Sequence, residues 1–113
     1  MRIGTVARLI ILWQRPYHLA EDEAVGWTRR QIGRMLDDGA VRDAELSLLR
    51  SASDRHPADY RWMLRVDLEA GVDGCDFVER PLCAEWLDDM RSLGAQPFVM
   101  LADSEPIERA NTA

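Results

Sequence analysis

The stretch Arg8-Leu9-Ile10-Ile11-Leu12-Trp13 decides how this chain folds. In a β-strand, successive side chains point to opposite faces of the sheet. Both sets of alternating positions are apolar here, whereas a sheet with helices on one side needs apolar residues on that side only. We therefore expect helices on one face of this strand and another protein chain on the other face. Either set of side chains could be the one that turns toward the helices.

The rest of the chain has the pattern strand, helix, strand, written twice. The expected elements are strands at 6–15, 41–50, 60–69 and 97–102, a helix at 20–38, and a second helix that begins near Asp76 or at Pro81 and ends at Gly94. Right-handed crossovers then give a four-stranded antiparallel sheet of order 4-1-3-2 with both helices on one face. The sequence thus predicts one two-layer α+β domain, with a core at about 6–103 and a flexible tail at 104–113.

Apolar residues at helical or alternating spacing support each of these elements. The first helix has an apolar stripe of Val25, Thr28, Ile32, Met35 and Leu36, and the second has one of Leu82, Cys83, Trp86, Leu87, Met90 and Leu93. Strand 41–50 alternates apolar and polar residues, which is typical of an edge strand. In strand 60–69 we expect Tyr60, Trp62, Leu64, Val66 and Leu68 to face the helices. Asp76 and Glu79 resemble a capping box at the start of the second helix.

Composition excludes several classes of function. The chain has 113 residues, a net charge of −6 and no lysine, so it would repel a nucleic-acid backbone and cannot form a lysine Schiff base. The run from Leu9 to Trp13 is far shorter than the roughly 20 apolar residues that cross a bilayer, so we expect a cytoplasmic protein. Cys75 and Cys83 do not form a Cys-x-x-Cys pair, and no spacing indicates a metal site.

The best acid–base candidate is His18, which follows the first strand. Imidazole titrates near neutral pH, and the ends of strands often border pockets. Arg15 and Tyr17 could stabilise an enolate or carboxylate beside it by charge-assisted hydrogen bonds. The alternatives are a solvated His18 in a loop and an Arg15 paired with Glu21 or Asp22. His56, in the loop predicted at 51–57, is a weaker candidate.

Three tryptophans are candidate substrate contacts. Trp62, on the helix-facing side of a central strand, and Trp86, on the second helix, could form the walls of a pocket for a flat molecule, although both could simply fill the core. Trp27 lies opposite the apolar stripe of its helix, so it either borders a pocket or interface or lies flat over arginine side chains. On the other face of strand 60–69, Arg61, Arg65, Asp67 and Glu69 could form ion pairs with Asp43 or Glu45.

The order of elements, the strand ending Trp13-Gln14-Arg15-Pro16 and the segment from Trp86 to Arg91 resemble the dimeric α+β barrel superfamily of ferredoxin-like domains. This superfamily includes antibiotic-biosynthesis monooxygenases, stress-responsive barrel proteins, EthD-like proteins and muconolactone isomerases. The resemblance covers about residues 6–103. It implies a ferredoxin-like βαββαβ fold, a homodimer packed sheet to sheet, and an apolar pocket between the sheet and the helices. The haem-degrading members have a His on the second helix, and none occurs between Asp76 and Gly94, so haem degradation is disfavoured.

Members that oxidise, cyclise or isomerise aromatic substrates frequently need no cofactor, so the resemblance implies none here. The leading hypothesis is therefore a small homodimeric, cofactor-independent monooxygenase, cyclase or isomerase that acts on an apolar aromatic or polyketide-like molecule. The alternative is a non-catalytic dimeric module that binds a ligand or takes part in assembly. No nucleic acid or membrane is expected as a partner.

Overall fold

The computed structural model describes residues 6–15, 19–37 and 39–110. The strands are β1 (Val6–Trp13), β2 (Val41–Leu48), β3 (Trp62–Leu68) and β4 (Phe98–Ser104), and the helices are α1 (Glu21–Leu36), α2 (Gly74–Glu79) and α3 (Pro81–Ser92). The order of strands and helices agrees with the prediction. None of the helices within the described ranges is long and apolar enough to cross a membrane.

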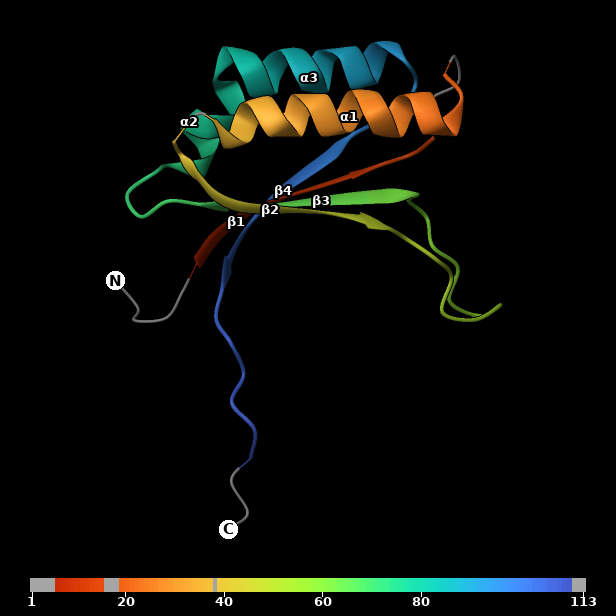
Figure 1. Cartoon of the computed structure of the whole chain (residues 1–113). Helices are drawn as coiled ribbons and strands as arrows, with labels where there is room; N and C mark the ends of the chain where they lie inside the picture. Colours follow the sequence, from red (N-terminus) through yellow and green to blue (C-terminus); the bar gives the residue numbers. More distant parts are fainter. Residues whose placement is uncertain (1–5, 16–18, 38, 111–113) are drawn as a thin grey trace.

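The four strands form one antiparallel sheet of order β2-β3-β1-β4, which is the order that the crossover argument predicts. The central strand β1 pairs with β3, where Trp13 lies opposite Trp62, and with β4, where Leu12 lies opposite Phe98. The edge strand β2 pairs with β3 through a register that places Leu46 opposite Leu64. Helices α1 and α3 lie along one face of this sheet (Figure 1), so the fold is the expected two-layer α+β arrangement.

The structure decides which face of β1 turns toward the helices. Leu9, Ile11 and Trp13 are at most 2% exposed and belong to the core between sheet and helices. Ile10 and Leu12 therefore point to the opposite side of the sheet, because neighbouring strand residues alternate. We call this side, where Ile10 and Leu12 lie, the open face.

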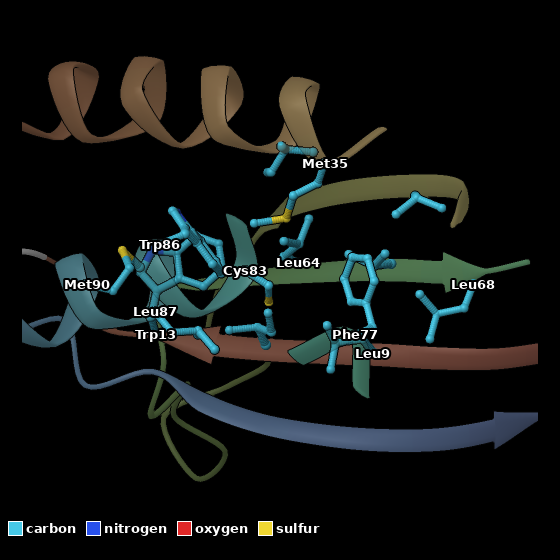
Figure 2. Close-up of a cluster of buried hydrophobic side chains, with 14 of the residues drawn as sticks. Leu9, Trp13, Met35, Leu64, Leu68, Phe77, Cys83, Trp86, Leu87 and Met90 are labelled. Carbon is cyan, nitrogen blue, oxygen red and sulfur yellow. The ribbon is translucent and has the colours of Figure 1, made fainter. Parts of the chain in front are cut away.

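The core joins β1 and β3 to the helices (Figure 2). Its largest fully buried side chains include Trp86 and Phe77 from the helices and Leu9, Ile11 and Leu64 from the sheet. Each such side chain contributes about 1.5–3 kcal/mol relative to an exposed one. Trp86 packs edge-to-face on Trp13, with ring centroids 5.4 Å apart. This packing fixes α3 over the middle of the sheet.

Three local predictions need correction. The capping box at Asp76 is wrong, since α2 begins at Gly74 and the side chain of Asp73 caps it by accepting a hydrogen bond from Cys75 N. The second helix is divided in two, because Pro81 lacks the N–H that would continue the α2 hydrogen bonds and begins α3 instead. On α1 the buried stripe contains Ala24 instead of Val25, and Leu36 is 42% exposed.

Candidate functional site

A groove runs between α1 and the edge strand β2. Its volume is about 590 Å³, and it is open to solvent along one side. Helix α1 lines it with Arg29, Ile32, Gly33 and Leu36. The sheet lines it with Ala44, Glu45, Leu46, Leu48 and Trp62. We call it the α1–β2 groove. Its size lies within the range of small-molecule sites, and most of its side chains are apolar.

Trp62 is the aromatic side chain of this groove. It is the first residue of β3, points to the helix-facing side as the alternation predicts, and is partly buried. Together with Trp13, Thr28 and Leu46 it also lines a small space beneath α1 that is too narrow for a water molecule. The indole of Trp62 thus separates the closed core from the open groove, so a flat ligand in the groove would contact it.

Trp86 takes a different position from Trp62. Trp86 is 1% exposed and belongs to the packed core, as does Cys83. Burial raises the pKa of the Cys83 thiol to about 11. The buried Cys83 confirms its predicted place in the core. Core packing is therefore the interpretation that the geometry favours for Trp86. Its Nε1 has no hydrogen-bond partner in the part of the chain that the structure describes, and this unpaired donor keeps it a candidate ligand contact.

Trp27 borders a second hollow instead of the α1–β2 groove. This hollow has a volume of about 420 Å³ and is lined by Leu19, Asp22, Glu23, Gly26, Trp27 and Arg30. Trp27 also packs partly against the core. The three tryptophans are consequently not brought to one pocket, and only Trp62 lies in the groove.

The predicted acid–base site at the end of β1 is described only in part. Tyr17 and His18 lie outside the described residues, and Arg15 is exposed just beyond Trp13. Near this strand end the guanidinium of Arg61 forms an ion pair with Glu21, at 2.9 Å. The sequence predicted Arg61 on the open face with Arg65 and Asp67, whereas the structure pairs it with the first residue of α1. Gln14 Nε2 donates to the backbone oxygen of Asp59. Both contacts lie beside Trp13, the last residue of β1, whose backbone oxygen accepts a hydrogen bond from Arg61 N.

His56 lies in the loop between β2 and β3, as predicted. Its Nδ1 lies 2.8 Å from Ser53 Oγ, and both residues are exposed. This contact closes the loop tip and does not approach the groove lining. The structure therefore gives His56 a local structural contact.

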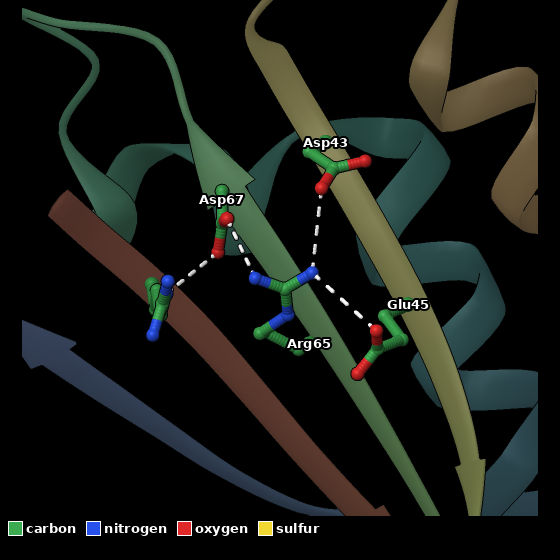
Figure 3. A network of polar contacts seen from close by, with 5 residues as sticks. Asp43, Glu45, Arg65 and Asp67 are labelled. Carbon is green, nitrogen blue, oxygen red and sulfur yellow. Dashed lines mark hydrogen bonds and ion pairs between the residues drawn. The ribbon is translucent and has the colours of Figure 1, made fainter. Parts of the chain in front are cut away.

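An ion network crosses the open face (Figure 3). Asp67 is 7% exposed and accepts hydrogen bonds from Arg8 Nε at 2.9 Å and from Arg65 at 2.8 Å. Arg65 also lies 3.3 Å from Asp43 and 3.9 Å from Glu45. The predicted pairs of Arg65 with Asp43 and Glu45 of β2 are thus confirmed. Asp67 pairs instead with Arg8 of β1 and with Arg65 of its own strand, and Glu69 follows the end of β3. Within the described ranges no group of three or more His, Cys, Asp or Glu side chains could hold a metal ion.

Three solved structures have a similar fold. One is a dimeric ferredoxin-like protein of unknown function from Thermobifida fusca, with a TM-score of 0.65 and 11% identity over 92% of this chain and 95% of that chain. Another is an EthD family protein from Bacillus halodurans, with a TM-score of 0.62 and 14% identity over 88% of this chain and 98% of that chain. The third is a hydroxynitrile lyase from Passiflora edulis, with a TM-score of 0.65 and 10% identity over 96% of this chain and 99% of that chain. At these identities the likeness establishes the fold alone. The fold is the ferredoxin-like βαββαβ fold, so the predicted resemblance is confirmed at the level of the fold.

More specific comparisons find nothing. No protein-family model matches the sequence, and no curated protein matches it either. The solved neighbours include both a lyase and a protein of unknown function, so the fold by itself does not assign a reaction.

Proposed function

We propose that this protein is a small homodimeric enzyme that binds an apolar aromatic or polyketide-like molecule in the α1–β2 groove and converts it without a cofactor. The observation that supports the proposal is the α1–β2 groove itself, which is open, mostly apolar, about 590 Å³ in volume and lined on one side by the indole of Trp62. A flat ring stacked on an indole gains both burial and favourable ring–ring contact.

The open face supports the proposed dimer. Ile10, Leu12, Phe98 and Met100 share that side of the sheet through their paired registers, and Phe98 and Met100 are 49% and 37% exposed. A second copy would cover these apolar side chains. One of the solved neighbours, the Thermobifida fusca protein, is itself described as dimeric.

The proposed chemistry is proton transfer at the end of β1. His18 would take an acidic proton from the substrate, and Arg15 and Tyr17 would stabilise the resulting enolate by hydrogen bonds. Trp62 would hold the ring system. Trp27 and Trp86 are proposed as further substrate contacts. Trp86 would require its buried indole to become accessible when a ligand binds, and Trp27 would contact a substrate in the separate hollow that it borders.

The test is turnover of a panel of polyketide and flavonoid-like aromatics, incubated in air and analysed by mass spectrometry. The proposal expects a product whose formation falls at least about tenfold in His18→Ala, the usual minimum for loss of an acid–base group. Trp62→Ala should raise KM. A rate that is unchanged in His18→Ala removes His18 from the mechanism, and a KM that is unchanged in Trp62→Ala removes the groove.

One observation favours a second candidate, a non-catalytic ligand-binding module. The described residues that line the groove contain no histidine or cysteine, so the groove by itself offers binding without a group that ordinarily titrates near neutral pH. Native mass spectrometry of the freshly purified protein would reveal a retained ligand. A ligand that leaves chemically unchanged after incubation in air would favour this candidate over the enzyme.

A further inference from the structure

The α1–β2 groove is apolar except for two charged residues in its lining, Arg29 on α1 and Glu45 on β2. If both charged groups faced the groove, they would neutralise each other. Which of them is available there decides what kind of ligand the groove can select. The register of β2 and the ion pairs of the open face show which of the two charged groups is available in the groove.

The carboxylate of Glu45 is directed away from the groove. Ala44 and Leu46, its neighbours on β2, are on the helix-facing side, and Glu45 lies opposite Arg65 in the strand register. Its carboxylate lies 3.9 Å from the guanidinium of Arg65 on the open face, as Figure 3 shows. Glu45 therefore contributes its charge to the network of the open face.

Among the described residues, Arg29 has no such partner. Its neighbours three and four positions away on α1, where helical ion pairs form, are Val25, Gly26, Ile32 and Gly33. None of them has a carboxylate. Across residues 6–15, 19–37 and 39–110, Arg29 takes part in no ion pair or side-chain hydrogen bond. A guanidinium at the margin of an apolar groove is thus left to interact with solvent or with a ligand.

We propose that the α1–β2 groove selects amphipathic anions: a flat apolar body packs on Trp62 and Leu46, and a carboxylate oxygen binds the guanidinium of Arg29. This inference rests on the proposed function and names its ligand class. Charge-assisted hydrogen bonds from a planar guanidinium are among the strongest and most directional available in proteins. Arg29 is then the residue that determines specificity in the groove.

Gly33 keeps the space for such a ligand. It lies one helical turn beyond Arg29, and a Cβ built there would meet no atom within 4 Å. Any larger side chain at this position would extend into the groove from the helix. Gly26 of the same helix lies in the separate hollow beside Trp27, outside the groove lining, and a Cβ there would meet only the flexible end of Arg30, at 3.6 Å. The two glycines form a matched pair for testing whether a ligand occupies the groove.

The experiment is isothermal titration calorimetry of the full chain with 2-naphthoate and with its neutral analogue 2-naphthamide. The two probes have the same ring system and differ in charge. The variants are Arg29→Gln, Arg29→Lys, Gly33→Leu and the control Gly26→Leu, each checked for native circular dichroism. Amide NMR shifts of the groove residues locate the bound probe independently of affinity.

The proposal expects naphthoate to bind about tenfold or more tightly than naphthamide to the wild type, because a charge-assisted hydrogen bond replaces a neutral one. Arg29→Gln should abolish this preference, Arg29→Lys should retain part of it, and Gly33→Leu should weaken both probes while Gly26→Leu weakens neither. Equal binding of the two probes, or a preference that survives Arg29→Gln, overturns the anion selectivity and leaves aromatic binding intact. Failure of both probes to bind, or binding that Gly33→Leu leaves unchanged, overturns the groove as the site and the proposed function with it.

Discussion

A single charge placed on the open face should separate the proposed dimer into monomers. Met100 lies opposite Ile10 in the register of β1 and β4, so it belongs to the apolar side of the sheet that faces away from the helices. We consider Met100→Asp, which replaces an apolar contact by a carboxylate of smaller volume. In a two-fold symmetric interface each substitution occurs twice.

The expected loss of dimer stability follows from the exposed fraction of the Met100 side chain. Met100 is 37% exposed in the single chain. Since complete burial of such a side chain contributes about 1.5–3 kcal/mol, covering the exposed part contributes about 0.5–1 kcal/mol per copy. An aspartate there also has to leave water without a partner, which costs at least about 1 kcal/mol per copy. The dimer should therefore lose at least about 3 kcal/mol, which raises Kd at least about 100-fold.

The assay is sedimentation velocity over a range of protein concentrations, with circular dichroism to verify the fold. Leu36→Asp is a matched control, because Leu36 is 42% exposed but lies on α1, on the other side of the sheet. It should leave the dimer unchanged. The reasoning is refuted by a wild-type protein that stays monomeric, by a Met100→Asp dimer as tight as the wild type, or by a dimer that dissociates in Leu36→Asp.

Three further predictions concern stability and reactivity. Gly33→Ala should raise the free energy of unfolding by about 0.5–1 kcal/mol in denaturant titrations, because its methyl group meets no atom within 4 Å, whereas Gly39→Ala, at a φ of 78°, should lower it. Asp67→Ala should lower the same quantity by about 1.5–3 kcal/mol, since it removes the carboxylate from two arginine side chains; equal urea midpoints would contradict this. Burial raises the pKa of Cys83 to about 11, so the stability that its neutral thiol provides is complete below pH 9 and is lost as the pH rises from 9 to 11. A thiol reagent at pH 8 should accordingly modify Cys75 alone in the native protein and both cysteines after unfolding.

Element order and strand order follow from the sequence because they depend on periodicity. The alternation from Trp62 to Leu68 identifies the helix-facing side of β3, and the crossover rule then places β1 and β3 in the centre. Periodicity could not decide the side of β1, because Leu9 and Ile10 are equally apolar. Only the three-dimensional packing, in which Trp13 meets Trp86 of α3 edge to face, selects one parity.

The groove could not be predicted in the same way. It depends on how far α1 stands from the edge of β2, and no pattern along the chain contains that distance. Its signals are weak in the sequence: a glycine at 33, where a helix ordinarily has a side chain, and an Arg29 without an acidic residue three or four positions away. The first helix also turns slightly from its predicted orientation, with Ala24 buried in place of Val25, which leaves Leu36 at the groove instead of in the core.

The central position of β1 has a consequence for biosynthesis. Leu9 pairs with Leu101, and Ile11 pairs with Leu64, so β1 is synthesised long before either of its partners exists. At about 5–20 residues per second, a ribosome takes roughly 5–20 s between completing β1 and completing β4. During that interval the uncharged run from Leu9 to Trp13 is a nascent segment with a strong tendency to aggregate. Arg8 and Arg15, which flank it, are placed as the charged gatekeepers that delay self-association until the late strands arrive.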